Sequence, residues 1–186
     1  MNLPNKLTLL RIALVPVFCM FLCLEGLVWQ IIALIVFLIA SLTDLLDGYI
    51  ARRDNLVTDF GKLVDPIADK LLITSAMIFM VAQTRMSATV VLLFVAREFV
   101  VSAFRMLAAS RGTVIAADKL GKYKTATQTL AIVLLILFKP MRGAQPLLGT
   151  SGMIAADIVT WIALVLSVVS CADYIYKNRA IIDRQP

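Results

Sequence analysis

Long apolar runs separated by short polar segments make up most of the chain. Windows of membrane-spanning length contain six such runs. A helix needs about 20 apolar residues to cross the hydrocarbon core of a bilayer. The pattern therefore predicts an all-α fold, an integral membrane bundle of six transmembrane helices. The runs extend over about Leu7 to Leu24, Val28 to Asp47, Leu63 to Ala82, Ala88 to Ala109, Lys122 to Phe138 and Met153 to Ile175.

The composition agrees with one membrane domain. The chain has 186 residues, of which 61% are apolar, and this excludes both a disordered chain and an ordinary water-soluble domain. Six spans with short connections use nearly the whole length, so we expect a single domain over residues 1–186. No small-residue cleavage pattern follows the first run, and we expect this run to remain as a span.

The distribution of basic residues indicates an orientation. If both termini lie on one side, that side holds Lys6, Arg11 and the segments 52–62, 111–124 and 177–184. The opposite connections carry only three basic residues, so the positive-inside rule predicts that both termini face the cytoplasm from the inner membrane. In a chain this apolar, the net charge of +6 favours anionic lipids and phosphate-bearing substrates over nucleic acid as partners.

Four aspartates lie where the second and third predicted spans meet. Asp44 and Asp47 are three residues apart, and Asp65 and Asp69 are four apart, so each pair lies on one helical face. A short connection between the two helices brings the pairs together. A carboxylate inside a membrane helix costs about 2.5 to 3.5 kcal/mol on insertion scales, so such a cluster requires a compensating charge.

Divalent cations would provide that charge. The chain contains no histidine, and sites made only of oxygen ligands suit Mg²⁺, Mn²⁺ or Ca²⁺. Two such ions close together can clamp a phosphate during an in-line displacement. The alternative is that the aspartates cap helices or pair with neighbouring cations, which are Arg52, Arg53, Lys62 and Lys70.

The complete pattern, D-x2-D-G-x2-A-R-x8-G-x3-D-x3-D, resembles the signature of the CDP-alcohol phosphatidyltransferase family at every fixed position. The resemblance implies that Asp44, Asp47, Asp65 and Asp69 bind two divalent cations, Mg²⁺ or Mn²⁺. It also implies that Asp69 is the catalytic base. The family fold that it implies is a bundle of six spans that faces the cytoplasm and forms a homodimer.

Gly48, Arg52 and Gly61 lie between and beside the two acid pairs. A glycine lets a bulky group approach the backbone, and an arginine can bind a pyrophosphate through charge-assisted bonds. Arg52 can instead anchor the helix at the membrane surface. The same resemblance implies that all three residues contact the CDP part of CDP-diacylglycerol.

Three further stretches resemble the branch of this family that uses glycerol 3-phosphate. They are residues 4–11 (PNKLTLLR), residues 96–99 (AREF) with Arg105, and residues 120–125 (LGKYKT). This resemblance implies transfer of the phosphatidyl group of CDP-diacylglycerol to glycerol 3-phosphate, which gives phosphatidylglycerophosphate and CMP. The alternative is the same chemistry with another acceptor, phosphatidylglycerol or inositol phosphate.

An acceptor that carries its own phosphate needs cations to bind it. The candidates are Arg105 and Lys122, joined by Arg97 and Lys124. Arg97 and Arg105 are about two turns apart and therefore share a face of the fourth predicted helix. The alternative is that Arg97 pairs with Glu98 or Asp69, and that the lysines anchor the next helix at the membrane surface.

Asn5 and Thr8 lie three residues apart just before the first span, where they can bond the nucleotide end of the donor. Helix capping is the alternative for Asn5. An ion transporter would also use carboxylates within the membrane. Its pathway should carry polar groups through its whole depth, whereas Asp157 is the lone carboxylate in the outward halves of these spans.

Overall fold

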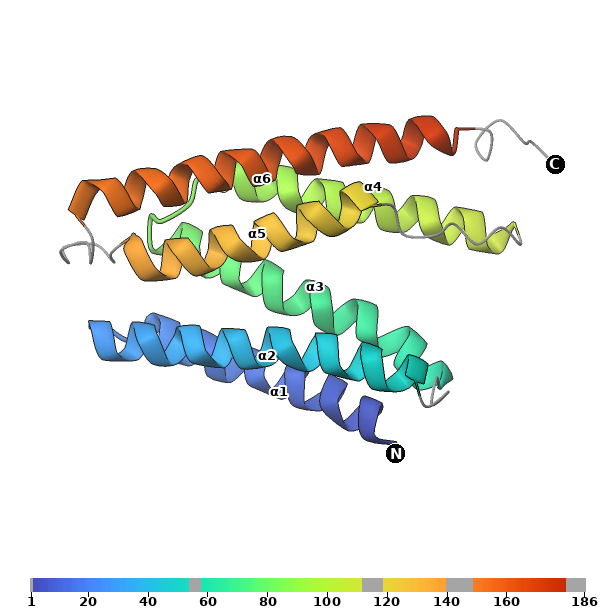
Figure 1. Ribbon diagram of the computed structural model, residues 1–186, viewed down its shortest axis with the longest axis horizontal. Helices are drawn as coiled ribbons and strands as arrows, with labels where there is room; N and C mark the ends of the chain where they lie inside the picture. Colours follow the sequence, from blue (N-terminus) through green and yellow to red (C-terminus); the bar gives the residue numbers. More distant parts are fainter. Residues whose placement is uncertain (1, 54–57, 112–118, 140–148, 180–186) are drawn as a thin grey trace. The chain divides into compact units, whose positions relative to one another are not determined.

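The computed structural model of the chain describes residues 2–53, 58–111, 119–139 and 149–179. Within these ranges it contains six α-helices and no strand, which confirms the all-α prediction (Figure 1). Among the described residues, three stretches are long and apolar enough to cross a membrane, namely Leu3–Cys23, Leu27–Gly48 and Thr150–Lys177. The helices are α1 (Leu3–Cys23), α2 (Leu27–Arg53), α3 (Asp59–Ala82), α4 (Ala88–Ser110), α5 (Lys119–Phe138) and α6 (Gly149–Lys177).

Helices α2 and α3 extend further toward each other along the chain than the apolar pattern predicted. Helix α2 ends at Arg53 and α3 begins at Asp59, several residues beyond the limits of the apolar runs. Thr58 caps α3, because its side-chain oxygen accepts a hydrogen bond from the Gly61 amide at 3.0 Å. The two aspartate pairs therefore lie inside helices and not at helix ends. A hydropathy window does not detect these helical turns, because they consist of polar residues.

Helices α1, α2 and α3 form the first of two compact units. Helix α1 packs along both α2 and α3, which contact each other much less. Phe18 and Phe37 lie in this core with ring centroids 5.5 Å apart, and the fully buried Ala33 and Ala40 let α2 approach its neighbours closely. The start of α1, the end of α2 and the start of α3 lie at the same end of this unit (Figure 1).

Helices α4, α5 and α6 belong to the second unit, in which α6 packs against both α4 and α5. Phe104 and Tyr174 meet edge to face, with ring centroids 5.9 Å apart. Lys139 at the end of α5 pairs with Asp157 of α6 at 2.8 Å. Asp157, the lone carboxylate in the outward halves of the predicted spans, is therefore explained by this ion pair, and no ion pathway is needed to explain it.

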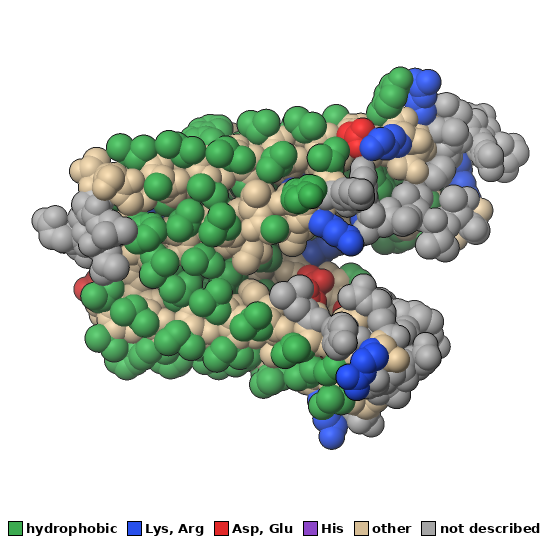
Figure 2. Space-filling model, in the orientation of Figure 1, with side chains coloured by type: hydrophobic (Ala, Val, Ile, Leu, Met, Phe, Trp, Pro, Cys, Tyr) green, Lys and Arg blue, Asp and Glu red, His purple; other side chains and the backbone are tan. Residues whose placement is uncertain are grey.

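The outward surfaces of the helices are apolar. On the face shown in Figure 2, hydrophobic side chains cover most of the described surface of each unit. In water this large apolar area would be exposed to solvent, whereas in a membrane the lipid chains would cover it. The exposed side chains of α6 include Ile154, Ile158, Trp161, Ile162, Val165, Val168 and Val169.

Arg85 is a buried cation after the end of α3. None of its three side-chain nitrogens has a hydrogen-bond partner in the described part of the chain. Burial lowers the pKa of the Arg85 guanidinium to about 10. The guanidinium is still protonated at neutral pH, so at this pH the folded state carries the free-energy penalty of a buried, unpaired charge. The penalty is lost only as the pH rises above the pKa of the group in the folded state.

Replacing Arg85 with methionine should therefore stabilise the protein. Methionine fills a similar volume without the charge, and such replacements of buried ionic groups are often neutral or stabilising by about 1 to 4 kcal/mol. Thermal unfolding of detergent-solubilised protein, followed by tryptophan fluorescence at pH 7, should show a higher midpoint for Arg85→Met. A lower midpoint would mean that the guanidinium stabilises the fold.

Candidate active site

The first unit contains a cluster of carboxylates around one buried arginine. Arg11 of α1 is fully buried, and its Nη1 lies 2.8 Å from Oδ1 of Asp44. The same nitrogen pairs with Asp69 of α3, and Nη2 pairs with Asp47 of α2. Three of the four predicted aspartates therefore meet at a single guanidinium, which neutralises part of their charge inside the bundle.

The fourth aspartate is also held by α1. The hydroxyl of Thr8 lies 2.6 Å from Oδ1 of Asp65 and 3.1 Å from the carbonyl oxygen of Pro4. The shorter distance is to a carboxylate, which is the stronger acceptor. Since α1 packs on both α2 and α3, it is the helix that gathers the two aspartate pairs at one end of the unit.

The carboxylates of this cluster differ in exposure. The side chain of Asp47 is 5% exposed, whereas those of Asp44 and Asp69 are 41% and 48% exposed. Asp47 therefore forms the closed side of the cluster. Asp44 and Asp69 form its more exposed side.

The ligand chemistry of this cluster fits a hard divalent cation. All four side chains offer only carboxylate oxygens, and three of them already surround a positive group, the Arg11 guanidinium. Among the residues that the structure describes, no three acidic, histidine or cysteine side chains are arranged as ligands of a metal ion. The metal-binding role of Asp44, Asp47, Asp65 and Asp69 stays a prediction.

A second group of polar side chains lies beside Asp65, at the start of α3. Thr58 donates its hydroxyl hydrogen to Oδ1 of Asn5 at 2.9 Å. A Cβ on Gly61 would lie 3.1 Å from the same Asn5 oxygen and 3.6 Å from Oδ2 of Asp65. Gly61 therefore allows a close approach of α1 to α3, which is the physical reason for a glycine at this position.

The structure also decides what caps α1. The N-cap is Asn2, whose side chain accepts a hydrogen bond from the Asn5 amide at 3.2 Å. The capping role considered for Asn5 is therefore wrong, and the side chain of Asn5 faces α3 instead.

Gly48 lies in α2 next to Asp47 and is partly buried. The side chain of Arg52 is outside the described part of the structure.

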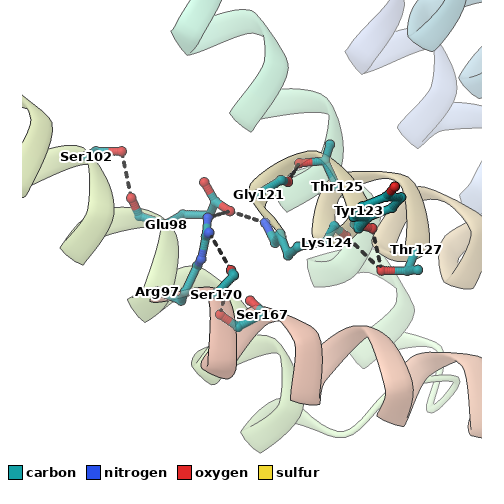
Figure 3. A network of polar contacts seen from close by, with 10 residues as sticks. All are labelled: Arg97, Glu98, Ser102, Gly121, Tyr123, Lys124, Thr125, Thr127, Ser167 and Ser170. Carbon is teal, nitrogen blue, oxygen red and sulfur yellow. Dashed lines mark hydrogen bonds and ion pairs between the residues drawn. The ribbon is translucent and has the colours of Figure 1, made fainter. Parts of the chain in front are cut away.

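The second unit contains a basic cluster, which we define as Arg97, Arg105, Lys122 and Lys124 with Glu98. Figure 3 shows Arg97, Glu98 and Lys124 of this cluster. The Arg97 guanidinium lies 3.1 Å from the Glu98 carboxylate and donates to Ser170 of α6 at 2.8 Å. Lys124, nearly completely buried, pairs with the same carboxylate across α4 and α5. The pairing of Arg97 with Glu98, considered from the sequence, is confirmed.

Arg105 and Lys122 differ from the other two cations of the basic cluster. The exposed Arg105 has its guanidinium 5.6 Å from the ring centroid of Tyr174, a cation–π contact that orients the group without neutralising it. Lys122 is exposed and has no ion pair with a described residue. Because Arg97 and Arg105 both contact α6, the prediction that they share one face of α4 is confirmed.

The sequence analysis missed several residues that shape these clusters. For Arg11, the sequence indicates membership of the PNKLTLLR stretch and a place in the charge distribution, but no contact with the aspartates. Thr58 gave no signal beyond its capping preference, and Ser170 and Tyr174 lie in an otherwise apolar run. The spacing of Ser170 and Tyr174 by four residues, on one face of α6, is the signal that could have indicated them.

Comparison with known proteins assigns the chain to a family. Residues 1–169 match the CDP-alcohol phosphatidyltransferase family. The chain is 41% identical over 190 residues to the CDP-diacylglycerol--glycerol-3-phosphate 3-phosphatidyltransferase of Bacillus subtilis, with 95% of each chain covered. It is 38% identical to the enzyme of the same name from Rickettsia felis, with 93% of each covered. A probable phosphatidylglycerophosphate synthase of Mycobacterium tuberculosis is 40% identical, with 95% of this chain and 81% of the relative covered.

Proposed function

Because the chain belongs to the CDP-alcohol phosphatidyltransferase family, we propose that it transfers the phosphatidyl group of CDP-diacylglycerol to glycerol 3-phosphate. The products are phosphatidylglycerophosphate and CMP. The observation that carries the proposal is the meeting of carboxylates from α2 and α3 at one end of an apolar helical unit. The names of the relatives, which match over nearly the whole chain, supply the acceptor.

In this proposal the carboxylates hold the metal. The family generally depends on divalent cations, and Asp44, Asp47, Asp65 and Asp69 would hold two of them, Mg²⁺ or Mn²⁺. When bound, such cations neutralise the donor diphosphate and stabilise charge on the transferred phosphorus and on the departing CMP. Thr8 fixes the position of Asp65 through its 2.6 Å hydrogen bond.

Asp69 is also the base. It is the more exposed member of the pair in α3, whose other member, Asp65, accepts from Thr8. Asp69 takes the proton of the 1-hydroxyl of glycerol 3-phosphate as that oxygen forms a bond to the β-phosphorus of the donor. The bond between this phosphorus and the CMP oxygen breaks, so no covalent enzyme intermediate is required.

The donor nucleotide is assigned to residues around the start of α3. Asn5, Thr8, Gly48, Arg52 and Gly61 are the proposed contacts of the CDP part. Asn5 and Gly61 support this assignment because they lie close together beside Asp65. The acyl chains of the donor remain in the membrane in this arrangement.

Gly61→Ala should weaken donor binding. The new methyl group would lie 3.1 Å from the Asn5 oxygen and 3.3 Å from the Thr58 oxygen, so Asn5 must move. We expect a KM for CDP-diacylglycerol raised about tenfold, the effect of a lost hydrogen bond. The matched control is Gly121→Ala, because a Cβ at Gly121 has nothing within 4 Å. Equal kinetics for the two variants would contradict the donor assignment of Gly61.

The acceptor phosphate is assigned to the basic cluster of the second unit. Glu98 pairs with Arg97 and Lys124 and so reduces their net positive charge. Arg105 and Lys122 keep their full charge and are exposed, so they are the primary phosphate ligands. Arg97 and Lys124 complete the positive field around them. The unit contributes a site of the type that a dianion requires.

The proposal places the enzyme in the inner membrane with six spans. Both termini and the active site face the cytoplasm, as the distribution of basic residues predicts. One catalytic domain comprises both units, since the family match covers helices of each. The chain is proposed to form a homodimer.

The choice of acceptor can be tested directly. Purified protein is mixed with CDP-diacylglycerol, Mg²⁺ and one radiolabelled acceptor, which is glycerol 3-phosphate, inositol phosphate or phosphatidylglycerol. Label from glycerol 3-phosphate should enter the lipid fraction with one CMP released for each lipid formed. Preferred incorporation of either other acceptor would retain the chemistry and overturn the proposed substrate.

A further inference from the structure

Arg11 has a place in the site that neither the family signature nor the proposed roles account for. It is fully buried, and it contacts three of the four carboxylates proposed to hold cations. One nitrogen, Nη1, is shared by Asp44 and Asp69, while Nη2 is directed to Asp47. The guanidinium therefore lies at the point where oxygens from α2 and α3 converge.

A guanidinium and a divalent cation cannot occupy the same point among these oxygens. A cation of the Mg²⁺ type requires oxygen ligands at about 2.0 to 2.1 Å, and the positive Arg11 would repel it at that distance. Without a counter-ion, converging carboxylates within one bundle would repel each other and separate α2 from α3. Arg11 supplies one positive charge to the group and contacts three of its carboxylates, which holds the group together.

We propose that Arg11 is the resident counter-ion of the carboxylate cluster and competes with divalent cations for Asp44, Asp47 and Asp69. The inference rests on the proposed function, because it takes these carboxylates as metal ligands. When metal binds, the guanidinium gives up carboxylate oxygens. Arg11 thus keeps the metal-free enzyme folded and weakens its affinity for metal.

The test compares two buried arginines of the same unit. Arg11→Met removes the competitor, whereas Arg85→Met removes an equally buried arginine that has no ion pair with a described residue. Binding of Mn²⁺ to purified protein without donor is measured by the loss of the free Mn²⁺ electron paramagnetic resonance signal. We expect the Kd of Arg11→Met to fall at least about tenfold and that of Arg85→Met to match the wild type.

Thermal unfolding gives a second readout in the same samples. Without metal, Arg11→Met should unfold at a lower temperature than the wild type, because the carboxylates lose their counter-ion. Saturating Mg²⁺ should raise its midpoint more than it raises that of the wild type. Arg11→Lys keeps the charge but not the planar fork, so both its Mn²⁺ affinity and its midpoint should be intermediate.

The outcomes separate this inference from the proposed function. The metal role of the carboxylates is overturned, and the inference with it, if the wild-type protein does not bind Mn²⁺. The same holds if Asp44→Asn and Asp47→Asn leave its Mn²⁺ binding unchanged. The inference alone is overturned if these substitutions remove Mn²⁺ binding but Arg11→Met binds Mn²⁺ no more tightly than the wild type. If the Arg11 variants fold only with metal, competition is supported; failure to fold even in saturating Mg²⁺ would overturn it.

Discussion

Asp69→Asn should lower the rate of CMP release about 10²- to 10⁴-fold, the usual contribution of a general base. Asparagine has nearly the same shape as aspartate and can still accept a hydrogen bond from Arg11, so α1 and α3 should stay packed. It cannot take the proton of the acceptor hydroxyl. The rate is measured as CMP released from CDP-diacylglycerol at saturating glycerol 3-phosphate and Mg²⁺.

The matched control for this variant is Asp157→Asn. Asp157 also lies in a helix, is 48% exposed like Asp69, and also pairs with a cation, Lys139. The Asp157→Asn variant should release CMP at a rate within about twofold of the wild-type rate, as expected for a surface substitution away from the site. Thermal unfolding confirms that both variants are folded. Normal turnover of folded Asp69→Asn would remove Asp69 from the mechanism.

Asp69→Asn also separates the two roles of this residue. A carboxylate that served only as a metal ligand would lose affinity for metal, and raising the Mg²⁺ concentration would restore part of the rate. A missing base is not replaced by metal. The loss in CMP release at saturating Mg²⁺ is therefore the part that belongs to proton transfer.

Much of the fold could be predicted from hydropathy, because a bilayer imposes long apolar helices. Each of the six observed helices overlaps one apolar run. The ends of α2 and α3 were predicted less well, since hydropathy records the apolar zone and not the helix. Thr58 shows the missing information, because its capping bond to the Gly61 amide sets where α3 begins.

The acid pairs could be predicted from spacing, because residues three or four apart share a helical face. Their partners could not. Arg11 lies more than 30 residues from Asp47 and meets it only because α1 packs on α2. Which faces of two helices meet depends on the whole packing of the unit. A cation in the first helix therefore gave no local sign of its partners.

Glu98 changes the interpretation of the basic cluster in a similar way. From the sequence, Arg97, Arg105, Lys122 and Lys124 are candidates for binding a phosphate, with Arg105 and Lys122 placed first. The structure divides them, because the Glu98 carboxylate pairs with Arg97 and Lys124. Among the cations on α4, Arg105 is the one whose charge is oriented by an aromatic ring and not neutralised by that carboxylate.

Arg105→Met should therefore impair acceptor binding more than the loss of either cation that pairs with Glu98. A lost charge-assisted hydrogen bond costs about 1.5 to 3 kcal/mol, so the KM for glycerol 3-phosphate should rise about 10- to 150-fold. The KM for CDP-diacylglycerol should stay close to the wild-type value. Initial rates of CMP release, with each substrate varied in turn, give both constants.

Arg179→Met is the control, because it removes the same kind of contact from the same unit. The Arg179 guanidinium lies 4.8 Å from the ring centroid of Tyr176, much as Arg105 lies over Tyr174. If Arg105 acts only by packing on its tyrosine, both variants should show the same small change. If it binds the acceptor phosphate, only Arg105→Met should raise the KM for glycerol 3-phosphate, and Arg105→Lys should recover part of the loss because it restores the charge.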